Sequence, residues 1–277
     1  MMNKCGLALL QDLEKPERIA LFRDMEKFSH FFLRDRKRWW PEVPWPPDPL
    51  HQWSRQLEYP YAFWQIQQTR EKGTKVLDAG SGVTFFPFYL AMNGYDVSCV
   101  DNDERLNSAF AQLNKDLPRR LNVNFRIASL TDLPNEDNTF SHVCCISVIE
   151  HIPRADLEKV LREFYRVLIP GGICILTVDV SLQVDTDAIL QIDTLDNFIT
   201  ILHKCGFELL YPVEVEHETS GLLSTIYFRK HNPALLPWTH PVSDSFYHKA
   251  RFWVKTNIFR RSTFNPLGVA LFSMRRR

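Results

Sequence analysis

The chain has 277 residues, enough for one large or two small domains with a sizeable buried core. Its 33 basic and 33 acidic residues balance, so no overall charge draws it to nucleic acid or to an anionic membrane. No apolar run approaches the roughly 18 residues of a membrane span, and the first residues are too weakly apolar for a secretory signal. We therefore expect a soluble, cytoplasmic protein.

Residues 1–70 are charged and aromatic, and we predict that they form an N-terminal helical arm. In the segment PERIALFRDMEKFSHFFLRDRKRWW, apolar residues recur at spacings of three and four, as in a helix, before the proline-rich break PEVPWPPDP. Five of the seven tryptophans lie between positions 39 and 64. These aromatic residues either pack onto the main domain as core or form a lid over a substrate pocket. In the second case, Tyr61 and Trp64 are candidate substrate contacts.

From residue 75, short β-rich runs alternate with helical segments, a pattern typical of a parallel α/β sheet. We expect strands at Lys75–Asp78, Asp96–Asp101, Asn124–Ala128, His142–Ser147 and Gly172–Val178, with FELLYPVEVE as a sixth. Helices are expected at Phe85–Asn93, Asp103–Leu113, Arg154–Val167 and Leu195–Cys205.

The last strand has two candidates, LLSTIYFRK and the later LGVALFSMR, and we favour the later one. This choice makes residues 71–277 one domain and leaves an insertion at about 216–265, which is too long for a simple connection. Six cysteines lie mostly in apolar runs without Cys-x-x-Cys pairs, so we expect reduced core thiols. They are Cys5, Cys99, Cys144, Cys145, Cys174 and Cys205.

A glycine turn follows the first expected strand, in KVLDAGSGVTFFPFYLA. The strand delivers Asp78 into Gly80-Ser81-Gly82, where glycines allow a ligand to approach free backbone N–H groups. The next strand ends in Asp101, about 20 residues later, where a carboxylate can accept both hydroxyls of a ribose. Together these features indicate a ligand that contains adenosine.

Other nucleotide sites fit this turn less well. A nicotinamide or flavin site uses G-x-G-x-x-G, and here Phe85 stands in place of the third glycine. A P-loop would need Gly-Lys-Ser/Thr, which is absent. The carboxylate of Asp78 would repel a pyrophosphate but suits an ammonium or sulfonium group.

Four segments resemble the successive motifs of class I S-adenosylmethionine-dependent methyltransferases. They are VLDAGSG, VDND, LTDLPNEDNTFSHVCCISVIEHIP and LREFYRVLIPGGICILTVD, in family order between residues 75 and about 215. The resemblance implies a Rossmann-like fold with a seven-stranded, mostly parallel sheet and helices on both faces. It implies S-adenosylmethionine as cofactor and S-adenosylhomocysteine as product.

The resemblance also implies roles for individual residues. Asp78, Gly80 and Gly82 match the motif around the methionine part of the cofactor, and Asp101 and Asn102 match the positions beside the ribose and the adenine. The family usually has an aspartate for the adenine amino group where Ser129 stands, so the backbone of Leu130 is the alternative contact. Further candidates are Ser147 at the methionine end and, by likeness of SRQLEYPY to an arm segment of some relatives, Arg55 and Tyr59.

Methyl transfer requires mainly alignment of the acceptor and removal of a proton where one must leave. His151, in VIEHIP, is the candidate base and a candidate substrate contact, and its alternative is a loop histidine that caps a turn. Relatives that bind a divalent metal use Glu-x-x-Glu-His, and Ser147 replaces the first glutamate, so we expect no metal. The Asp/Asn-Pro-Pro-Tyr/Phe motif used on amide and amino nitrogens of DNA and protein is absent, as is the Pro-Cys nucleophile used on cytosine carbon.

The segment from His248 to Arg277 carries eight basic residues and no acid, with aromatic residues between them. It suits RNA, an anionic lipid surface or an acidic substrate, and the alternative is a solvated basic face. Its basic residues are Lys249, Arg251, Lys255, Arg260, Arg261, Arg275, Arg276 and Arg277.

The leading hypothesis is a metal-independent methyltransferase that acts on an oxygen or nitrogen of a small, partly apolar metabolite, of the kind made in secondary metabolism. The aromatic arm favours it. The alternatives are an RNA or protein methyltransferase that uses the basic C-terminal segment, and a non-catalytic regulatory protein that binds the cofactor.

Overall fold

A computed structural model describes residues 2–34, 49–69, 74–183, 190–191, 194–214, 221–236 and 266–277. The strands in these ranges are β1 (Cys5–Leu7), β2 (Lys75–Ala79), β3 (Asp96–Asp101), β4 (Asn124–Ile127), β5 (Phe140–Ile146), β6 (Leu168–Ser181), β7 (Phe207–Leu209), β8 (Val213–Glu214) and β9 (Leu267–Arg276). The α-helices are α1 (Pro16–Leu33), α2 (Arg55–Gln68), α3 (Phe86–Met92), α4 (Leu106–Asp116), α5 (Leu157–Val167), α6 (Leu195–Lys204) and α7 (Thr225–His231). Short 3-10 helices are η1 (Leu10–Glu14), η3 (Pro49–His51), η4 (Arg119–Leu121), η5 (Ile149–His151), η6 (Arg154–Asp156) and η9 (Pro233–Leu235).

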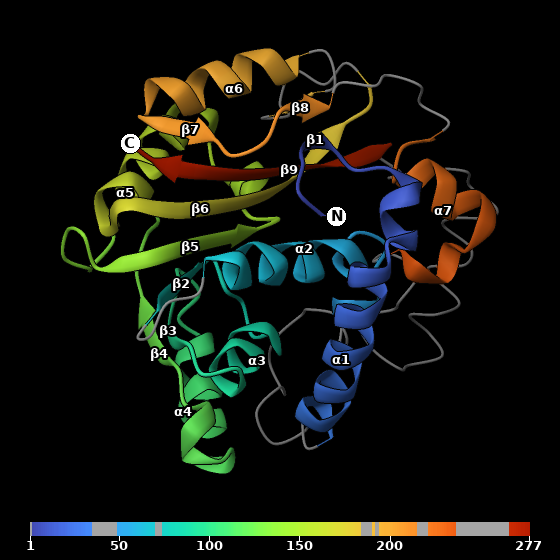
Figure 1. Ribbon diagram of the computed structural model, residues 1–277. Helices are drawn as coiled ribbons and strands as arrows, with labels where there is room; N and C mark the ends of the chain where they lie inside the picture. Colours follow the sequence, from blue (N-terminus) through green and yellow to red (C-terminus); the bar gives the residue numbers. More distant parts are fainter. Residues whose placement is uncertain are drawn as a thin grey trace.

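The strands of the described residues form one mixed sheet in the order β4-β3-β2-β5-β6-β9-β1-β8, and β7 also pairs with β9 (Figure 1). Strands β4, β3, β2, β5 and β6 are parallel to their neighbours, whereas β9 runs antiparallel to β6, β1 and β7. The expected α/β sheet, mostly parallel and Rossmann-like, is confirmed. Parallel order places the carboxyl ends of five strands at one edge, where such sheets bind ligands.

All seven expected strands are present, and the sheet has nine strands because the expected sixth is divided in two and β1 is added. The expected sixth strand is divided into β7 and β8 at residues 210–212, where Pro212 has no N–H to donate. Strand β1, formed by residues 5–7, was not expected, because three residues carry no periodic pattern. It pairs with both β8 and β9.

The favoured last strand, LGVALFSMR, is β9, and the rejected candidate LLSTIYFRK contains helix α7 instead. Ser224 begins this helix because its hydroxyl accepts a hydrogen bond from the backbone N–H of Tyr227 at 3.3 Å. The later segment is the better strand because it is buried over most of its length and bonded on both sides.

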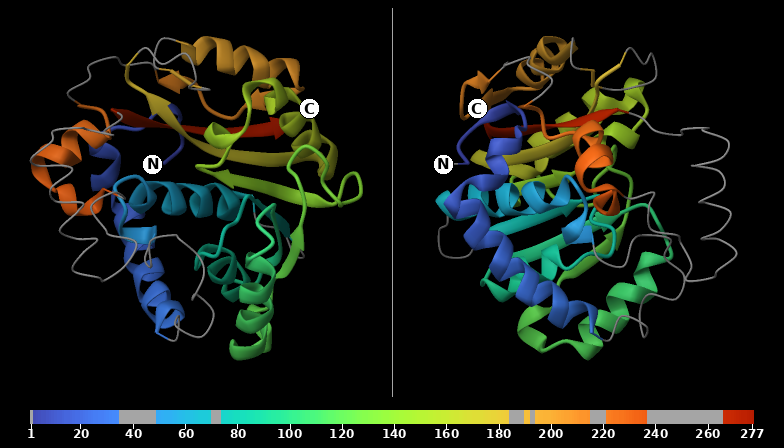
Figure 2. Two further views of the ribbon diagram at one scale, coloured as in Figure 1. Left: turned by 180° about the vertical axis from the view of Figure 1, so that it is seen from behind. Right: turned by 90° about the vertical axis from the view of Figure 1, so that its right-hand side faces the viewer.

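Helices cover both faces of the sheet (Figures 1 and 2). The apolar residues of α1, α2, α3 and α4 share one core cluster with one face. Those of α5 and α6 share a second cluster with the other face. All six cysteines are free and buried within the structure, as expected.

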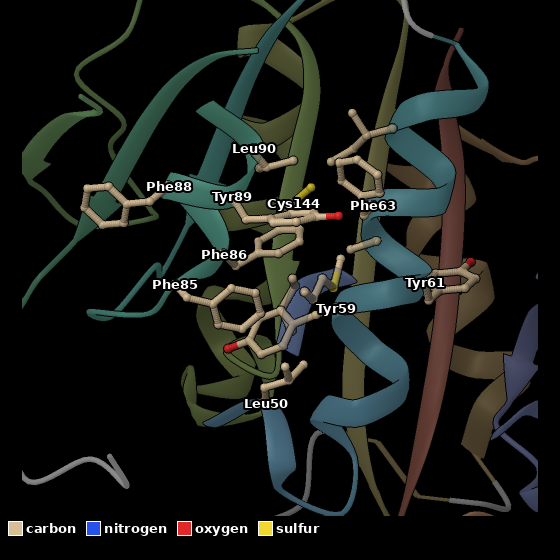
Figure 3. Packing of buried hydrophobic residues seen from close by; sticks show 14 of the residues in the cluster. Leu50, Tyr59, Tyr61, Phe63, Phe85, Phe86, Phe88, Tyr89, Leu90 and Cys144 are labelled. Carbon is tan, nitrogen blue, oxygen red and sulfur yellow. The ribbon is translucent and has the colours of Figure 1, made fainter. Parts of the chain in front are cut away.

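An aromatic layer joins α2 to α3 beneath the carboxyl edge of the sheet (Figure 3). The ring of Tyr59 stacks on Phe86 at 5.1 Å between centroids and meets the edge of Phe85 at the same distance. Phe63 meets Tyr89 edge to face at 5.0 Å. Burial of such rings, with favourable pair geometry, fixes α2 over the sheet.

Several predicted features lie outside the described residues. They include Trp39, Trp40 and Trp45, most of the 216–265 insertion, and five of the eight basic residues of the C-terminal segment. The division of the chain at residue 70 stays a prediction, although β1 and β2 on either side of it belong to one sheet. Among the described helices, none is long and apolar enough to span a membrane.

Candidate functional site

A cavity of about 650 Å³ opens at the carboxyl edge of the parallel strands. It is large enough for a cofactor-sized ligand, since ligand pockets commonly measure about 300 to 1,000 Å³. Most predicted site residues line it: Arg55, Tyr59, Asp78, Gly80, Gly82, Asp101, Asn102, Ser129, Leu130, Ser147 and His151.

A second cavity of about 640 Å³ lies near the opposite ends of β2, β5 and β6, lined by Thr69, Lys75 and His142 among others. The two cavities are similar in volume, so volume does not identify the site. The first one holds the predicted side chains, and it lies where parallel sheets bind ligands.

The glycine turn after β2 is held open by backbone geometry. Gly80 and Gly82 both have positive φ angles, +75° and +51°. The N–H of Gly80 donates to the carbonyl of Val100 at 2.8 Å, which ties the turn to β3. A Cβ atom on residue 80 would lie 2.5 Å from Cγ1 of Val148, so the position requires glycine for space as well as for conformation.

Asp101 at the end of β3 is oriented by two backbone donors. Its Oδ2 accepts from the N–H of Gly82 at 2.9 Å, and its Oδ1 accepts from the N–H of Asp103 at 3.1 Å. The carboxylate therefore connects the glycine turn to the following turn while it lines the cavity.

Asp78 is 4% exposed at the end of β2. Burial, and then the negative charge of Asp101, raise the pKa of Asp78 to about 7. A cation placed beside it would favour the charged carboxylate and lower that pKa. The turn is therefore suited to an ammonium or sulfonium group.

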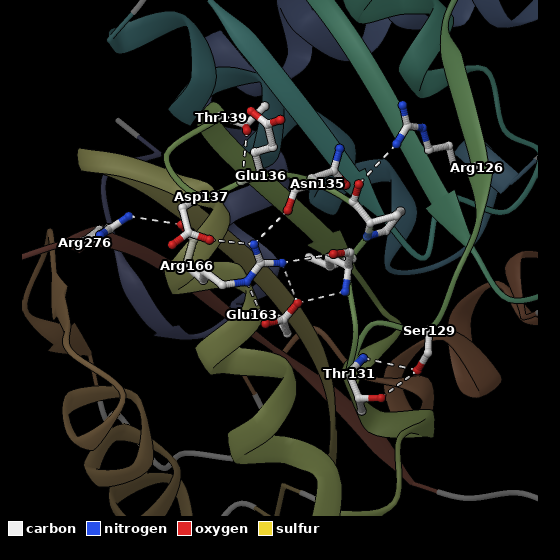
Figure 4. A network of polar contacts seen from close by, with 12 residues as sticks. Arg126, Ser129, Thr131, Asn135, Glu136, Asp137, Thr139, Glu163, Arg166 and Arg276 are labelled. Atoms are coloured by element: carbon white, nitrogen blue, oxygen red, sulfur yellow. Dashed lines mark hydrogen bonds and ion pairs between the residues drawn. The ribbon is translucent and has the colours of Figure 1, made fainter.

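A polar network supports the loop after β4 that carries Ser129 and Leu130 (Figure 4). Arg166 on α5 bonds to Glu163 at 2.7 Å and to the carbonyls of Leu133 and Asn135 at 3.0 and 2.7 Å. The hydroxyl of Ser129 is paired with that of Thr131 at 2.8 Å. Ser129 thus makes a local turn, and it is also available at the cavity wall.

Helix α2 delivers a charged pair to the cavity. The guanidinium of Arg55 donates to the carboxylate of Glu58 and to the hydroxyl of Ser147, and that hydroxyl donates to Oε1 of Glu58 at 2.6 Å. Ser147 has a φ of +45°, and its N–H donates to the carbonyl of Thr177 at 2.9 Å. A tight turn after β5 therefore presents the Ser147 hydroxyl to α2.

His151, at the end of η5, is exposed and lines the cavity. Desolvation in the cavity wall and the charge of Arg55 both lower the pKa of His151. A neutral imidazole at neutral pH can accept a proton, so its placement is compatible with a base.

Tyr61 and Trp64, the other predicted substrate contacts, do not line the cavity. The Tyr61 hydroxyl donates to the carbonyl of Lys4 at 2.9 Å, and the Trp64 indole donates to Oδ1 of Asn3 at 2.7 Å. Both point from α2 toward the N-terminal segment. Their role as substrate contacts stays a prediction, and the helical turn of α2 directs both side chains away from Tyr59.

Residues 77–176 match the family model described as a methyltransferase domain. The order of motifs, the sheet and the cavity at its carboxyl edge agree with that match. The matched stretch, which runs from β2 to β6, is a methyltransferase domain.

Curated relatives of this methyltransferase domain act in different reactions by name. A phosphoethanolamine N-methyltransferase of Triticum aestivum is 37% identical over 100 residues, 36% of this chain and 19% of the relative. Methyltransferase GfsG of Streptomyces halstedii is 27% identical over 219 residues, 72% of this chain and 71% of the relative. The chain spans about a fifth of the length of the first two curated relatives that it matches.

Among solved structures, the methyltransferase domain is similar to the [4+2]-cyclase SpnF, with a TM-score of 0.58 and 20% identity over 84% of this chain and 85% of that one. This likeness shows the fold alone. Because that neighbour is named a cyclase, the fold by itself does not establish methyl transfer.

Three acidic residues at or near the first cavity were not among the predicted site residues. Asp179 lines the cavity from the end of β6. The negative charge of Glu58 helps to raise the pKa of Asp179, and the charges of Asp179 and Glu58 help to raise the pKa of Glu150. A carboxylate at the carboxyl end of a buried parallel strand was the signal that could have identified Asp179. In the described part of the chain, no group of three or more His, Cys, Asp or Glu residues has an arrangement that could hold a metal ion.

Proposed function

We propose that the chain binds S-adenosylmethionine in the cavity at the carboxyl edge and transfers its methyl group to an oxygen or nitrogen of a small molecule. The observation that carries the proposal is the arrangement of Asp101. This carboxylate is held by the N–H groups of Gly82 and Asp103 at the end of β3, facing the cavity beside the glycine turn.

The roles of the other residues follow the cavity wall. We assign the ribose to Asp101, the adenine side to Asn102, Ser129 and Leu130, and the methionine part to the turn at Gly80 and Gly82 with Asp78. Arg55, Tyr59, Ser147 and His151 line the same cavity. The guanidinium of Arg55 suits the carboxylate of the methionine part, and Tyr59 offers a fixed ring face.

The reaction needs little from the protein beyond alignment. The acceptor lone pair attacks the methyl carbon of the sulfonium, the bond from sulfur to that carbon breaks, and its electrons stay on sulfur as S-adenosylhomocysteine forms. A proton on the acceptor must leave, and His151 is the candidate to receive it, being neutral at pH 7 by the lowered pKa.

The small-molecule choice rests on the cavity volume of about 650 Å³ and on the names of the relatives, which include a phosphoethanolamine N-methyltransferase and a ubiquinone biosynthesis O-methyltransferase of Pseudomonas syringae. For the RNA or protein alternative, the described basic residues offer little support. Arg276 is occupied by Asn138 and by the carbonyl of Arg166, and Arg277 lies 3.6 Å from Glu208.

Calorimetric titration with S-adenosylhomocysteine tests the proposal. We expect micromolar binding to the wild-type protein and a loss of at least about tenfold, or 1.4 kcal/mol, in Asp101→Ala. Asp96→Ala is the matched control, because Asp96 is an exposed aspartate at the other end of the same strand. Absence of binding by the wild-type protein, or equal losses in the two variants, would contradict the assignment.

A further inference from the structure

Three carboxylates gather around one guanidinium at the end of the cavity formed by α2, β6 and η5. Glu58 belongs to α2, Glu150 to η5 and Asp179 to β6. Arg55 attracts all three, and the charges of Glu58 and Asp179 repel that of Glu150. The group therefore contains three carboxylates and one guanidinium.

The hydrogen bonds of this group are unevenly distributed. Glu58 is fully buried and is satisfied by Arg55 and by the Ser147 hydroxyl. By contrast, Oδ1 of Asp179 is shielded from solvent and has no hydrogen-bond partner among the described residues, and the equally shielded carboxylate oxygens of Glu150 have none beyond the backbone N–H of Glu150 itself. Buried acceptors without donors are costly, and their presence calls for an explanation.

Asp179 faces the cavity, so a ligand there can supply the missing donor. Its position is fixed by the strand: Asp179 lies two residues after Thr177, whose carbonyl and hydroxyl accept from the N–H of Ser147. The side chain consequently lies on the face of the sheet that α2 covers, on the side of Arg55 and Ser147.

We infer that Asp179, supported by Glu150, forms a subsite for a protonated amino group, so that the methyl acceptor is an amine that enters the cavity as a cation. This inference rests on the proposed function and narrows its acceptor from oxygen or nitrogen to nitrogen. A cation with several N–H donors supplies both the charge and the hydrogen bonds that the subsite lacks.

The subsite also suits the chemistry at nitrogen. An ammonium has no free lone pair, so it must lose a proton before it attacks the methyl carbon. Asp179 holds the ammonium, and His151 in the same cavity wall, whose pKa is lowered by burial and by the charge of Arg55, is the group that can take the proton. The neutral amine then attacks, the sulfonium becomes a neutral thioether, and the product is an N-methylammonium ion.

An oxygen acceptor fits the same charges less well. A phenol would have to become a phenolate beside Asp179, Glu150 and Glu58, and like charges at close range disfavour that anion. An amine avoids this repulsion. Its ammonium form is attracted to the carboxylates before the transfer, and its methylated product is a cation as well.

The test uses wild-type protein loaded with S-adenosylhomocysteine and three amine probes, each with its alcohol isostere. The pairs are ethanolamine with ethylene glycol, butylamine with butanol, and 2-phenylethylamine with 2-phenylethanol. At pH 8, saturation-transfer NMR titrations should show at least one amine binding tenfold or more tightly than its alcohol. In Asp179→Asn, this preference should fall at least tenfold, with unchanged affinity for S-adenosylhomocysteine.

Two controls make the result specific. Asp196→Asn removes an exposed aspartate on α6, outside the residues that line the cavity, and should leave the preference intact. Glu150→Gln should reduce the preference in the same direction as Asp179→Asn. Equal binding of amines and alcohols, no binding of any amine, or a loss of S-adenosylhomocysteine affinity in Asp179→Asn would overturn the subsite.

Failure of the subsite is distinguishable from failure of the proposed function. Methyl transfer from radiolabelled S-adenosylmethionine is measured to the same probes. Amines that bind without becoming labelled would contradict methyl transfer and leave the subsite standing. Labelled alcohols with unlabelled amines would support methyl transfer and overturn the subsite.

Discussion

At the residue scale, the cavity depends on a few backbone positions that only particular residues can occupy. Gly80 combines a positive φ with a close approach to Val148, whereas Gly171 has nearly the same φ, +79°, with no atom within 4 Å of the place that a Cβ would take. Substitution of these two glycines therefore distinguishes the energetic cost of a positive φ angle from the cost of a steric clash with the added Cβ atom.

We expect Gly171→Ala to lower the free energy of unfolding by about 1 to 2 kcal/mol, the usual penalty for the left-handed region. Gly80→Ala should cost more, because Val148 or the turn itself must also move, and it should weaken S-adenosylhomocysteine binding at least tenfold. Urea unfolding and calorimetry measure the two effects. Similar stability losses with full binding in both variants would show that the turn accommodates a side chain.

At the element scale, α2 has two roles on two of its faces. One face brings Arg55 and Tyr59 to the cavity, and another holds the N-terminal segment through Tyr61, Trp64 and Gln65, whose amide donates to the carbonyl of Met2 at 2.7 Å. The helix therefore links the cavity wall to strand β1, which is bonded to β9.

Tyr61→Phe tests which role this residue has. The substitution keeps the buried ring and removes the hydrogen bond to Lys4, so we expect the free energy of unfolding to fall by about 1 kcal/mol. Affinity for S-adenosylhomocysteine should not change, and neither should turnover of any acceptor found. A specific rise in the acceptor KM without a stability loss would return Tyr61 to the substrate site.

At the scale of the whole molecule, buried ionisable groups make stability depend on pH. Asp78 has a pKa of about 7 in the folded protein against 3.8 as its ordinary value, so between about pH 4 and 7 the folded state holds a proton that the unfolded state has lost. Stability contributed by this group consequently falls as the pH rises through that window. Buried His142, with its pKa lowered to about 4, acts in the opposite direction below pH 6.5.

Comparison with Asp78→Asn isolates the first effect. The wild-type protein should lose stability relative to this variant as the pH rises from 5 to 7, with a limiting slope of about 1.4 kcal/mol per pH unit, and the difference should level off above pH 7. Urea unfolding at pH 5, 6, 7 and 8 measures the difference. Saturating S-adenosylmethionine should reduce it, because a cation beside Asp78 favours its charged form. A difference that is constant with pH would show that Asp78 titrates normally.

Local sequence patterns predict the parallel sheet, its glycine turn and the acid at the end of the next strand. These features are local, since a strand, a turn and its glycines lie within about 25 residues and follow from periodicity and backbone sterics. The family motifs between residues 75 and about 215 are local patterns of the same kind. The match of residues 77–176 to the methyltransferase-domain family model agrees with them.

Contacts between residues that are far apart in the chain could not be predicted from these local patterns. Strand β1 meets β9 across more than 260 residues, and Glu58 meets Ser147 across 89. The direction of Tyr61 and Trp64 depends on which face of α2 the N-terminal segment covers. The burial of the carboxylate oxygens of Asp179 and Glu150 depends on how β6 and η5 pack together. No local pattern encodes these pairings, because each is set by how buried surfaces match when the elements come together.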